Sequence, residues 1–274
     1  MEELTSFMSL AAYLAGTAGY IATVFRRRPE VERFAFYAVV FAALLHLTGL
    51  LLGTIFHGRV TFTSSKTVLS LFTFLVVALF ICLRFRFRTA VLGVFILPLV
   101  VICMVGSLAI PASLIPENPA LRNGWVLFHL VTIVIAYAFF AVSFCVSVVY
   151  LFHEKALKEK SYHRLMERMP SLEFLDRINH VCIALGFPFM TVGLITGFAA
   201  ARFLWDRFWS GDPKEIFSLI TWVIYAVLFH ERLAVGWRGR RASWLAICGF
   251  ICVMATFLGV NLVIKGHHTT FVGR

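Results

Sequence analysis

Long apolar blocks separated by short charged stretches run along the whole 274-residue chain. A helix needs about 20 apolar residues to cross the hydrocarbon core of a bilayer, and each block is close to that length. The pattern predicts an all-α polytopic membrane helix bundle of eight transmembrane helices in a single integral membrane domain. The predicted spans are 7–25, 34–56, 67–83, 90–110, 125–152, 181–203, 216–233 and 244–264.

The composition supports a membrane protein and excludes a soluble enzyme. Hydrophobic residues make up 60% of the chain and charged residues 14%, against about 45–50% and about 25% in soluble domains. All six cysteines lie inside apolar blocks without a CxxC pair, which indicates buried small residues and not a disulfide framework or a thiol redox site. The net charge of +11 is spread over short connections, so we do not expect nucleic-acid binding.

The distribution of basic residues predicts the orientation. The connections after the first, third, fifth and seventh predicted spans hold 17 of the 25 Lys and Arg residues. By the positive-inside rule these connections are cytoplasmic, so both termini lie outside. Only Glu2 and Glu3 precede the first apolar run, without Lys or Arg, so we interpret this run as a true span and not as a cleaved signal.

The longest predicted cytoplasmic connection covers residues 153–180. Its apolar residues alternate with charged ones, which is typical of an amphipathic segment at the membrane surface, and Pro170 interrupts it. An interfacial role and a partner-docking role both fit this pattern.

The outward connection 204–215 ends in a typical helix start. Asp212 is a suitable N-cap, Pro213 suits the first helical position, and Glu215 can reach back as in a capping box. Lys214 belongs to the same first turn. We therefore expect the seventh helix to begin at this point.

Histidines and aromatic residues meet on the predicted outer face. His129 stands at the outer end of the fifth span, and His267 and His268 follow the outer end of the eighth. Two neutral imidazoles can bind the iron of one haem from opposite sides. Trp205, Phe208 and Trp209 would stack on the haem, while Arg207 and Lys214 are candidate partners for its propionates. Alternatively, each histidine forms an ordinary hydrogen bond and the tryptophans belong to an interfacial belt.

Two further histidines lie at predicted membrane depth. His46 is near the middle of the second span, and His230 closes the seventh span near the cytoplasmic side. Ionisable residues inside a membrane usually mark a ligand or a pathway. His46 could equally hydrogen-bond a neighbouring helix, and His230 could be an interfacial residue favoured at a helix C-terminus.

At these residues the chain resembles the cytochrome c assembly family of haem-handling membrane proteins, of the CcsA, ResC and CcmC type. The resemblance is strongest over residues 120–268. It rests on Trp205, Trp209, Asp212-Pro213-Lys214-Glu215, Trp222, Tyr225, His230, Gly236-Trp237-Arg238-Gly239, Gly186-Phe187-Pro188 and Gly193-Leu194-Ile195-Thr196-Gly197. The chain departs from the family's tryptophan-rich WWD motif twice, with Asp206 in place of a glycine and Gly211 in place of the third tryptophan.

The resemblance implies a role in c-type cytochrome biogenesis in the bacterial inner membrane. It implies that His129 and His268 are axial ligands of a haem b held on the outer face, and that His230 is a transmembrane haem histidine. The protein would present haem for covalent attachment to apocytochrome c, with a second membrane subunit that carries a periplasmic domain, as in a holocytochrome c synthase. No residue is typical of a covalent nucleophile.

Two alternatives remain open. A related eight-span branch, encoded beside glutamyl-tRNA reductase, keeps the fold with a degraded tryptophan motif, so Gly211 favours a non-catalytic regulator of tetrapyrrole synthesis. A small-molecule transporter with His46 and His230 as a polar path is the second alternative.

Overall fold

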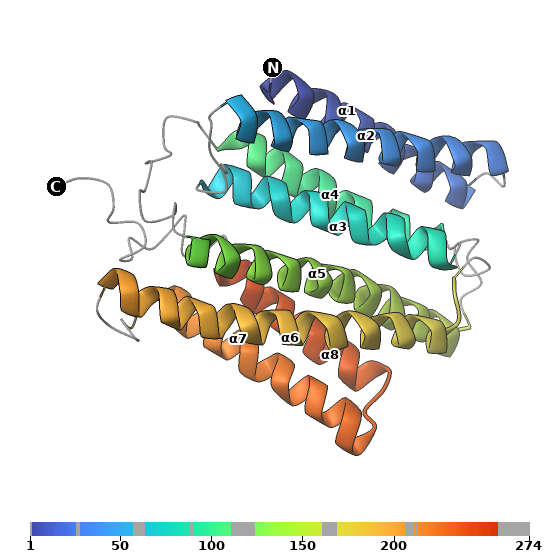
Figure 1. Cartoon of the computed structure of the whole chain (residues 1–274). Helices are drawn as coiled ribbons and strands as arrows, with labels where there is room; N and C mark the ends of the chain where they lie inside the picture. The colour runs from blue at the N-terminus through green and yellow to red at the C-terminus, as the bar shows by residue number, and fades with distance from the viewer. Residues whose placement is uncertain are drawn as a thin grey trace. The chain divides into compact units, whose positions relative to one another are not determined.

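The computed structural model describes residues 2–25, 28–56, 64–87, 90–110, 124–160, 169–205, 211 and 213–256. Within these ranges the chain forms eight α-helices, one short π-helix and no strand, which confirms the all-α prediction (Figure 1). The elements are α1 (Glu2–Phe25), α2 (Pro29–Phe56), α3 (Ser65–Phe87), α4 (Val91–Ala109), α5 (Gly124–Lys158), α6 (Leu172–Trp205), α7 (Pro213–His230), η4 (Glu231–Val235) and α8 (Arg240–Met254).

Seven helical segments are long and apolar enough to cross a membrane among the described residues. They correspond to α1 to α7, and the last of them continues through η4 to Val235. The eighth helix, α8, has 15 residues in the described part of the chain, which ends at residue 256. The protein is therefore a multi-pass membrane protein, as the apolar blocks predicted.

Several helices extend further than their predicted spans, and the longest extensions are in α5 and α6. α5 runs to Lys158 instead of ending near 152, and α6 begins at Leu172 instead of 181. The predicted connection 153–180 is thus helical at both ends, while Pro170 lies outside either helix and residues 161–168 lie outside the described residues. Charged residues can continue a helix because i,i+4 ion pairs support it, and Lys158 Nζ lies 2.8 Å from Glu154 Oε1.

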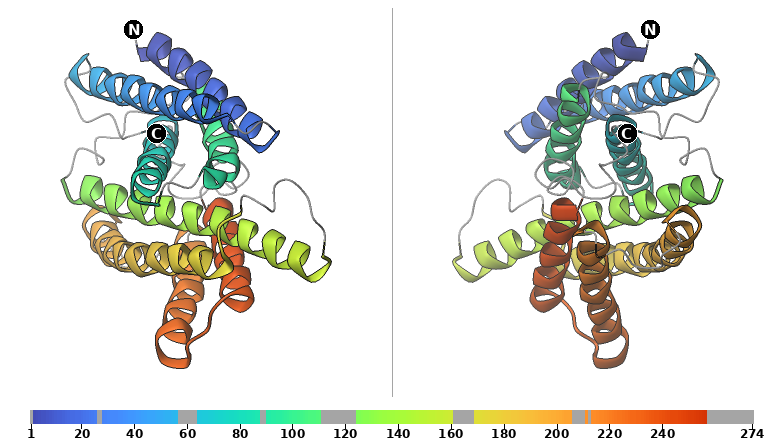
Figure 2. Two further views of the ribbon diagram at one scale, coloured as in Figure 1. Left: turned by 90° about the vertical axis from the view of Figure 1, so that its right-hand side faces the viewer. Right: turned by 90° about the vertical axis from the view of Figure 1, so that its left-hand side faces the viewer.

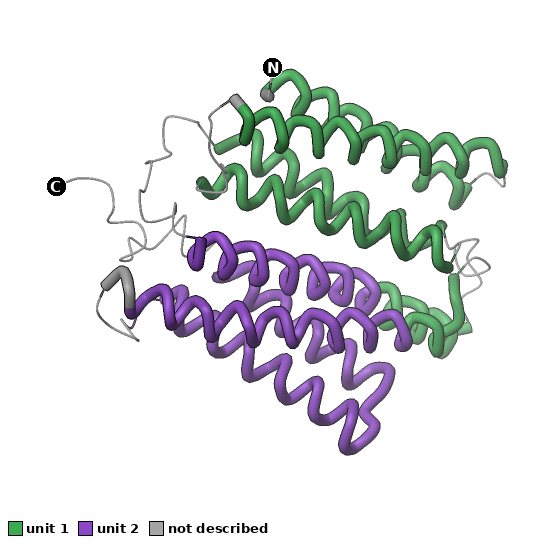
Figure 3. Tube along the Cα trace, viewed as in Figure 1, with its two compact units in different colours: residues 1–115, 149–175 green, residues 116–148, 176–274 purple. Residues whose placement is uncertain are grey.

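The chain divides into two compact units (Figure 3). The first unit comprises residues 1–115 and 149–175. In it α1 packs tightly on α2, because a Cβ on Gly19 would lie 2.7 Å from the Cβ of Ala35. Such close approach of small residues is typical of helices that associate in membranes.

The second unit comprises residues 116–148 and 176–274. Its core contains the stacked rings of Phe140 and Tyr225, whose centroids are 3.5 Å apart. Glycines on two neighbouring helices leave room for this pair, since a Cβ on Gly186 would lie 2.7 Å from Phe140 and one on Gly249 would lie 2.7 Å from Tyr225. α7 and α8 lie side by side and are joined at one end by η4 and a short connection (Figure 2).

Candidate functional site

His129 lies near the start of α5 and contacts α6. Its Nδ1 is 2.6 Å from the carbonyl oxygen of Gly193. A carbonyl oxygen can only accept a hydrogen bond, so Nδ1 carries the hydrogen and donates it. In the neutral ring Nε2 therefore keeps its lone pair, which is the form of imidazole that binds a metal.

Two glycines of α6 allow α5 to approach closely beside this imidazole. A Cβ on Gly197 would lie 2.7 Å from His129 Cε1, and one on Gly193 would lie 2.6 Å from Ile133 Cγ1. The Gly193 carbonyl also accepts a hydrogen bond from Thr196 Oγ1 at 3.0 Å. The sequence showed these glycines only as part of a family pattern. Their spacing of four residues on a membrane helix was the signal that another element packs there.

The start of α7 follows the helix-start pattern of the sequence. α7 begins at Pro213, as expected. Glu215 reaches back, and its Oε2 accepts a hydrogen bond from the amide of Gly211 at 3.1 Å. Gly211 has φ +75°, a left-handed backbone that glycine adopts without strain. Asp212 itself lies outside the described residues.

The other predicted residues of the outer site are only partly covered. Phe208, Trp209 and His268 lie outside the described residues, and Trp205 is described only as the last residue of α6. Lys214 is half-buried in the first turn of α7. The second axial ligand and the aromatic platform therefore stay predictions.

His46 lies in α2 and is hydrogen-bonded through both of its ring nitrogens. Its side chain is buried, with the residue 2% exposed. Nδ1 lies 3.2 Å from the hydroxyl of Tyr13 in α1, and Nε2 lies 2.8 Å from Ser70 Oγ in α3. This arrangement favours the helix-linking interpretation over a ligand role, because an incoming metal would have to displace one of these hydroxyls. Neither Tyr13 nor Ser70 stands out in the sequence as a partner of His46.

His230 is the last residue of α7 and is exposed. The buried residues of this helix are Thr221, Tyr225 and Leu228, and Arg232 in η4 is buried as well. His230 is two positions from both Leu228 and Arg232, about 200° around a helix from each. Its side chain therefore faces away from the core of its unit.

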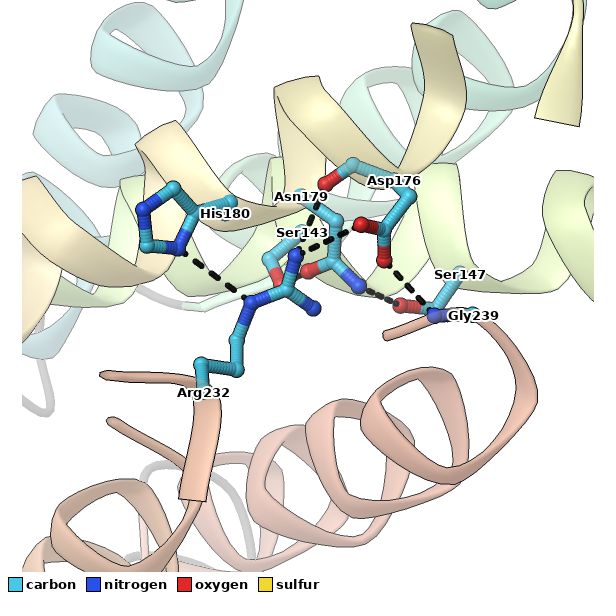
Figure 4. A network of polar contacts seen from close by, with 7 residues as sticks. All are labelled: Ser143, Ser147, Asp176, Asn179, His180, Arg232 and Gly239. Carbon is cyan, nitrogen blue, oxygen red and sulfur yellow. Dashed lines mark hydrogen bonds and ion pairs between the residues drawn. The ribbon is translucent and has the colours of Figure 1, made fainter. Parts of the chain in front are cut away.

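A polar network lies next to this helix end (Figure 4). Arg232 Nη2 donates to Asp176 Oδ2 at 3.0 Å, and Arg232 Nε donates to His180 Nδ1 at 3.2 Å. Asp176 Oδ1 accepts from the amide of Gly239 at 2.8 Å. Neither Arg232 nor Asp176 stands out in the sequence as a site residue. Gly236 and Gly239, both with positive φ, were the signal that a tight turn lies there.

Comparison with known proteins places the chain in a family. A family model described as "Cytochrome C assembly protein" matches residues 67–268. The chain belongs to this family. The predicted CcsA-type resemblance is confirmed. The matched range contains His129, the two glycines of α6 beside it, His230 and the polar network.

Its relatives include two proteins named cytochrome c biogenesis protein CcsA. The one from Gloeobacter violaceus is 31% identical over 326 aligned residues, covering 98% of this chain and 96% of the relative. The one from Heterosigma akashiwo is 32% identical over 222 residues, covering 68% of this chain and 69% of the relative.

A solved structure shares the fold of this family member. It is named cytochrome c heme lyase CcmF and superposes with a TM-score of 0.71 over 94% of this chain, at 16% identity. The chain spans 46% of the length of that solved chain.

Proposed function

We propose that this protein acts in cytochrome c biogenesis by binding haem on the outer membrane face and presenting it for covalent attachment to apocytochrome c. Family membership and relatives named for cytochrome c biogenesis support this function. The observation that carries it is the hydrogen bond from His129 Nδ1 to the Gly193 carbonyl, which leaves Nε2 as the ring's free base.

A metal-binding histidine almost always donates its second ring N–H to a carboxylate or a carbonyl oxygen. That bond fixes the ring direction and makes the ligating nitrogen more basic. In His129 the bond is made by a backbone carbonyl within a packed helix pair, so the ring is oriented before any ligand arrives. We assign His129 as one axial ligand of a haem b and His268 as the other.

The remaining residues of the proposed site hold the porphyrin and not the iron. Trp205, Phe208 and Trp209 would stack against its plane, and Lys214 would neutralise a propionate. Asp212 would hold the first turn of α7 in place as its N-cap. Haem itself supplies the vinyl carbons to which the thiols of the apocytochrome add.

We further propose that the protein works in a bacterial inner membrane with a second membrane subunit that carries a periplasmic domain. His230 faces away from the core of its own unit, so a haem bound there would need contacts from outside that unit. Such an exposed position supports a ligand shared with a partner.

The test uses the full-length protein purified in mild detergent from haem-producing cells. We expect a bis-histidine optical spectrum in the unmodified protein. His129→Gly should lose most of this haem, and added imidazole should restore part of it by filling the vacant axial position. A double His129→Gly, His268→Gly variant that keeps the original spectrum would overturn the ligand assignment.

The regulator of tetrapyrrole synthesis remains the second candidate, because Gly211 stands where the family motif has a tryptophan. Maturation of a c-type cytochrome in a strain that lacks this protein separates the two. Loss of holocytochrome, restored by the unmodified chain and not by His129→Gly, supports haem presentation. Normal maturation in the deletion strain supports the regulator. A colourless, haem-free protein would favour the transporter.

A further inference from the structure

The π-helix η4 follows His230 directly and closes through a single carbonyl. Glu231 O accepts hydrogen bonds from the amides of Gly236 and Trp237, the latter at 3.0 Å. A π-turn is rare, and it frequently occurs at functional sites. It persists only where surrounding contacts hold it in place. The contacts that hold this one come from α6.

Asp176 is the centre of these contacts. One carboxylate oxygen accepts a hydrogen bond from Arg232 Nη2 and the other accepts one from the amide of Gly239. A single side chain therefore bonds to both ends of the connection between α7 and α8. Arg232 Nη2 also donates to the backbone carbonyl of Asp176 at 3.0 Å. The Arg232 side chain is only 3% exposed, so water competes little for these bonds.

The part of α6 that carries Asp176 is itself fixed to α5. Asn179 Oδ1 accepts a hydrogen bond from Ser143 Oγ at 2.5 Å, and Asn179 Nδ2 donates to Ser147 Oγ at 3.1 Å. Figure 4 shows these residues next to the Asp176–Arg232 pair, between α5 and the connection that follows α7. The α6 segment that bonds to the connection is therefore itself held by hydrogen bonds to α5.

Stability alone gives a poor account of this arrangement. A buried ion pair adds little net stability compared with well-packed apolar residues of similar volume. Arg232 Nη1 is also buried without a hydrogen-bond partner among the described residues, which is costly. What the pair does provide is a fixed geometry for the helix end that carries His230.

We propose that Asp176 and Arg232 are positioning residues that hold the last turn of α7 so that His230 points outward to bind haem. This inference rests on the proposed function, because it takes a second haem, distinct from the one on the outer face, as the ligand of His230. Arg232 continues the buried stripe of α7 on one side, and His230 projects on the opposite side. When the ion pair is lost, the π-turn is no longer held and the His230 ring is no longer fixed in direction.

The experiment uses the full-length chain with three changes: Arg232→Gln, Arg232→Lys and Asp176→Ala. Arg241→Gln is the matched control, since Arg241 is an exposed arginine in the first turn of α8 and lies over the ring of Trp237. The first readout is the haem retained in a His129→Gly background, with His129→Gly, His230→Gly as the zero point. The second is the rate at which diethyl pyrocarbonate modifies His230, followed by peptide mass mapping.

We expect Arg232→Gln and Asp176→Ala to lower haem retention in that background about tenfold, as loss of an outer-shell partner does at metal sites. Arg232→Lys, which keeps the charge, should recover part of it, and Arg241→Gln should leave it unchanged. Both disruptive variants should melt at a lower temperature, because removing one partner leaves the other charge buried and unpaired. In the folded protein the rate at which diethyl pyrocarbonate modifies His230 should change. Unchanged haem retention together with unchanged His230 reactivity in the folded variants overturns the inference.

The two failures can be told apart. If the unmodified protein holds no haem, the proposed function fails. The modification rate of His230 then still tests whether Asp176 and Arg232 position this side chain. If the protein holds haem at His129 and His230 but Arg232→Gln changes neither haem retention nor the modification rate of His230, the positioning role is wrong and the proposed function stands.

Discussion

The imidazole of His129 and the carbonyl of Gly193 form a hydrogen bond of 2.6 Å between α5 and α6. The bond joins a candidate metal ligand to a backbone atom that no side-chain substitution removes. The orientation of the ring then depends on how closely the two helices approach, and the glycines at 193 and 197 permit that approach.

Substituting Gly197 with alanine should therefore disturb haem binding without touching a ligand. The new Cβ would lie 2.7 Å from His129 Cε1, so the ring must shift. We expect about tenfold weaker haem binding, comparable to losing an outer-shell partner, measured as haem per protein. Gly106→Ala is the control, because its Cβ would make only an ordinary contact of 3.4 Å with Leu69. Equal haem content in both variants would show that the packing of Gly197 against His129 does not matter for haem binding.

His46→Leu should reduce stability and leave haem binding intact. The change strands the hydroxyls of Tyr13 and Ser70, which now bond the ring, and an unsatisfied buried group costs about 1–3 kcal/mol. Thermal unfolding in detergent measures the loss. His46→Gln, which keeps a donor and an acceptor, should lose less. A normal melting temperature combined with loss of haem would instead make His46 a ligand.

Gly211→Trp restores the ring that the family motif has at this position. A Cβ at Gly211 meets nothing within 4 Å, but φ is +75°, and a left-handed backbone costs a residue other than glycine about 1–2 kcal/mol. We expect lower stability than in Gly211→Asn, since asparagine tolerates this conformation. Haem per folded protein should rise, because an added aromatic contact contributes about 1 kcal/mol. A near-zero haem content that the tryptophan leaves unchanged would count against haem presentation.

Asp212→Ala should destabilise the start of α7 by about 0.5–2 kcal/mol, the usual cost of a lost N-cap. Asp212→Asn should be mild, because asparagine caps equally well. The measurement is thermal unfolding together with haem content. If the asparagine variant melts normally yet holds no haem, the carboxylate contacts the ligand directly and the capping account is wrong.

The sequence by itself determined the parts of this protein that depend on chain-local physics. Apolar length predicted membrane helices, because backbone groups in lipid must be satisfied within the segment. Asp212 and Pro213 predicted where α7 begins, since a capping residue followed by proline is typical of a helix start. The residues around His129, His230 and Asp212 were sufficient to identify the family.

Tertiary structure alone decided which atoms meet. Nothing local distinguishes Gly193 as the acceptor for His129, because the two are 64 positions apart and helix packing sets their distance. Asp176 and Arg232 looked like ordinary charges at span ends, and only the turn through Gly239 brings them into one buried network. The apolar pattern fixes which residues enter the membrane, whereas the rotation of each helix about its axis, and hence each polar contact, is set by how neighbouring side chains pack.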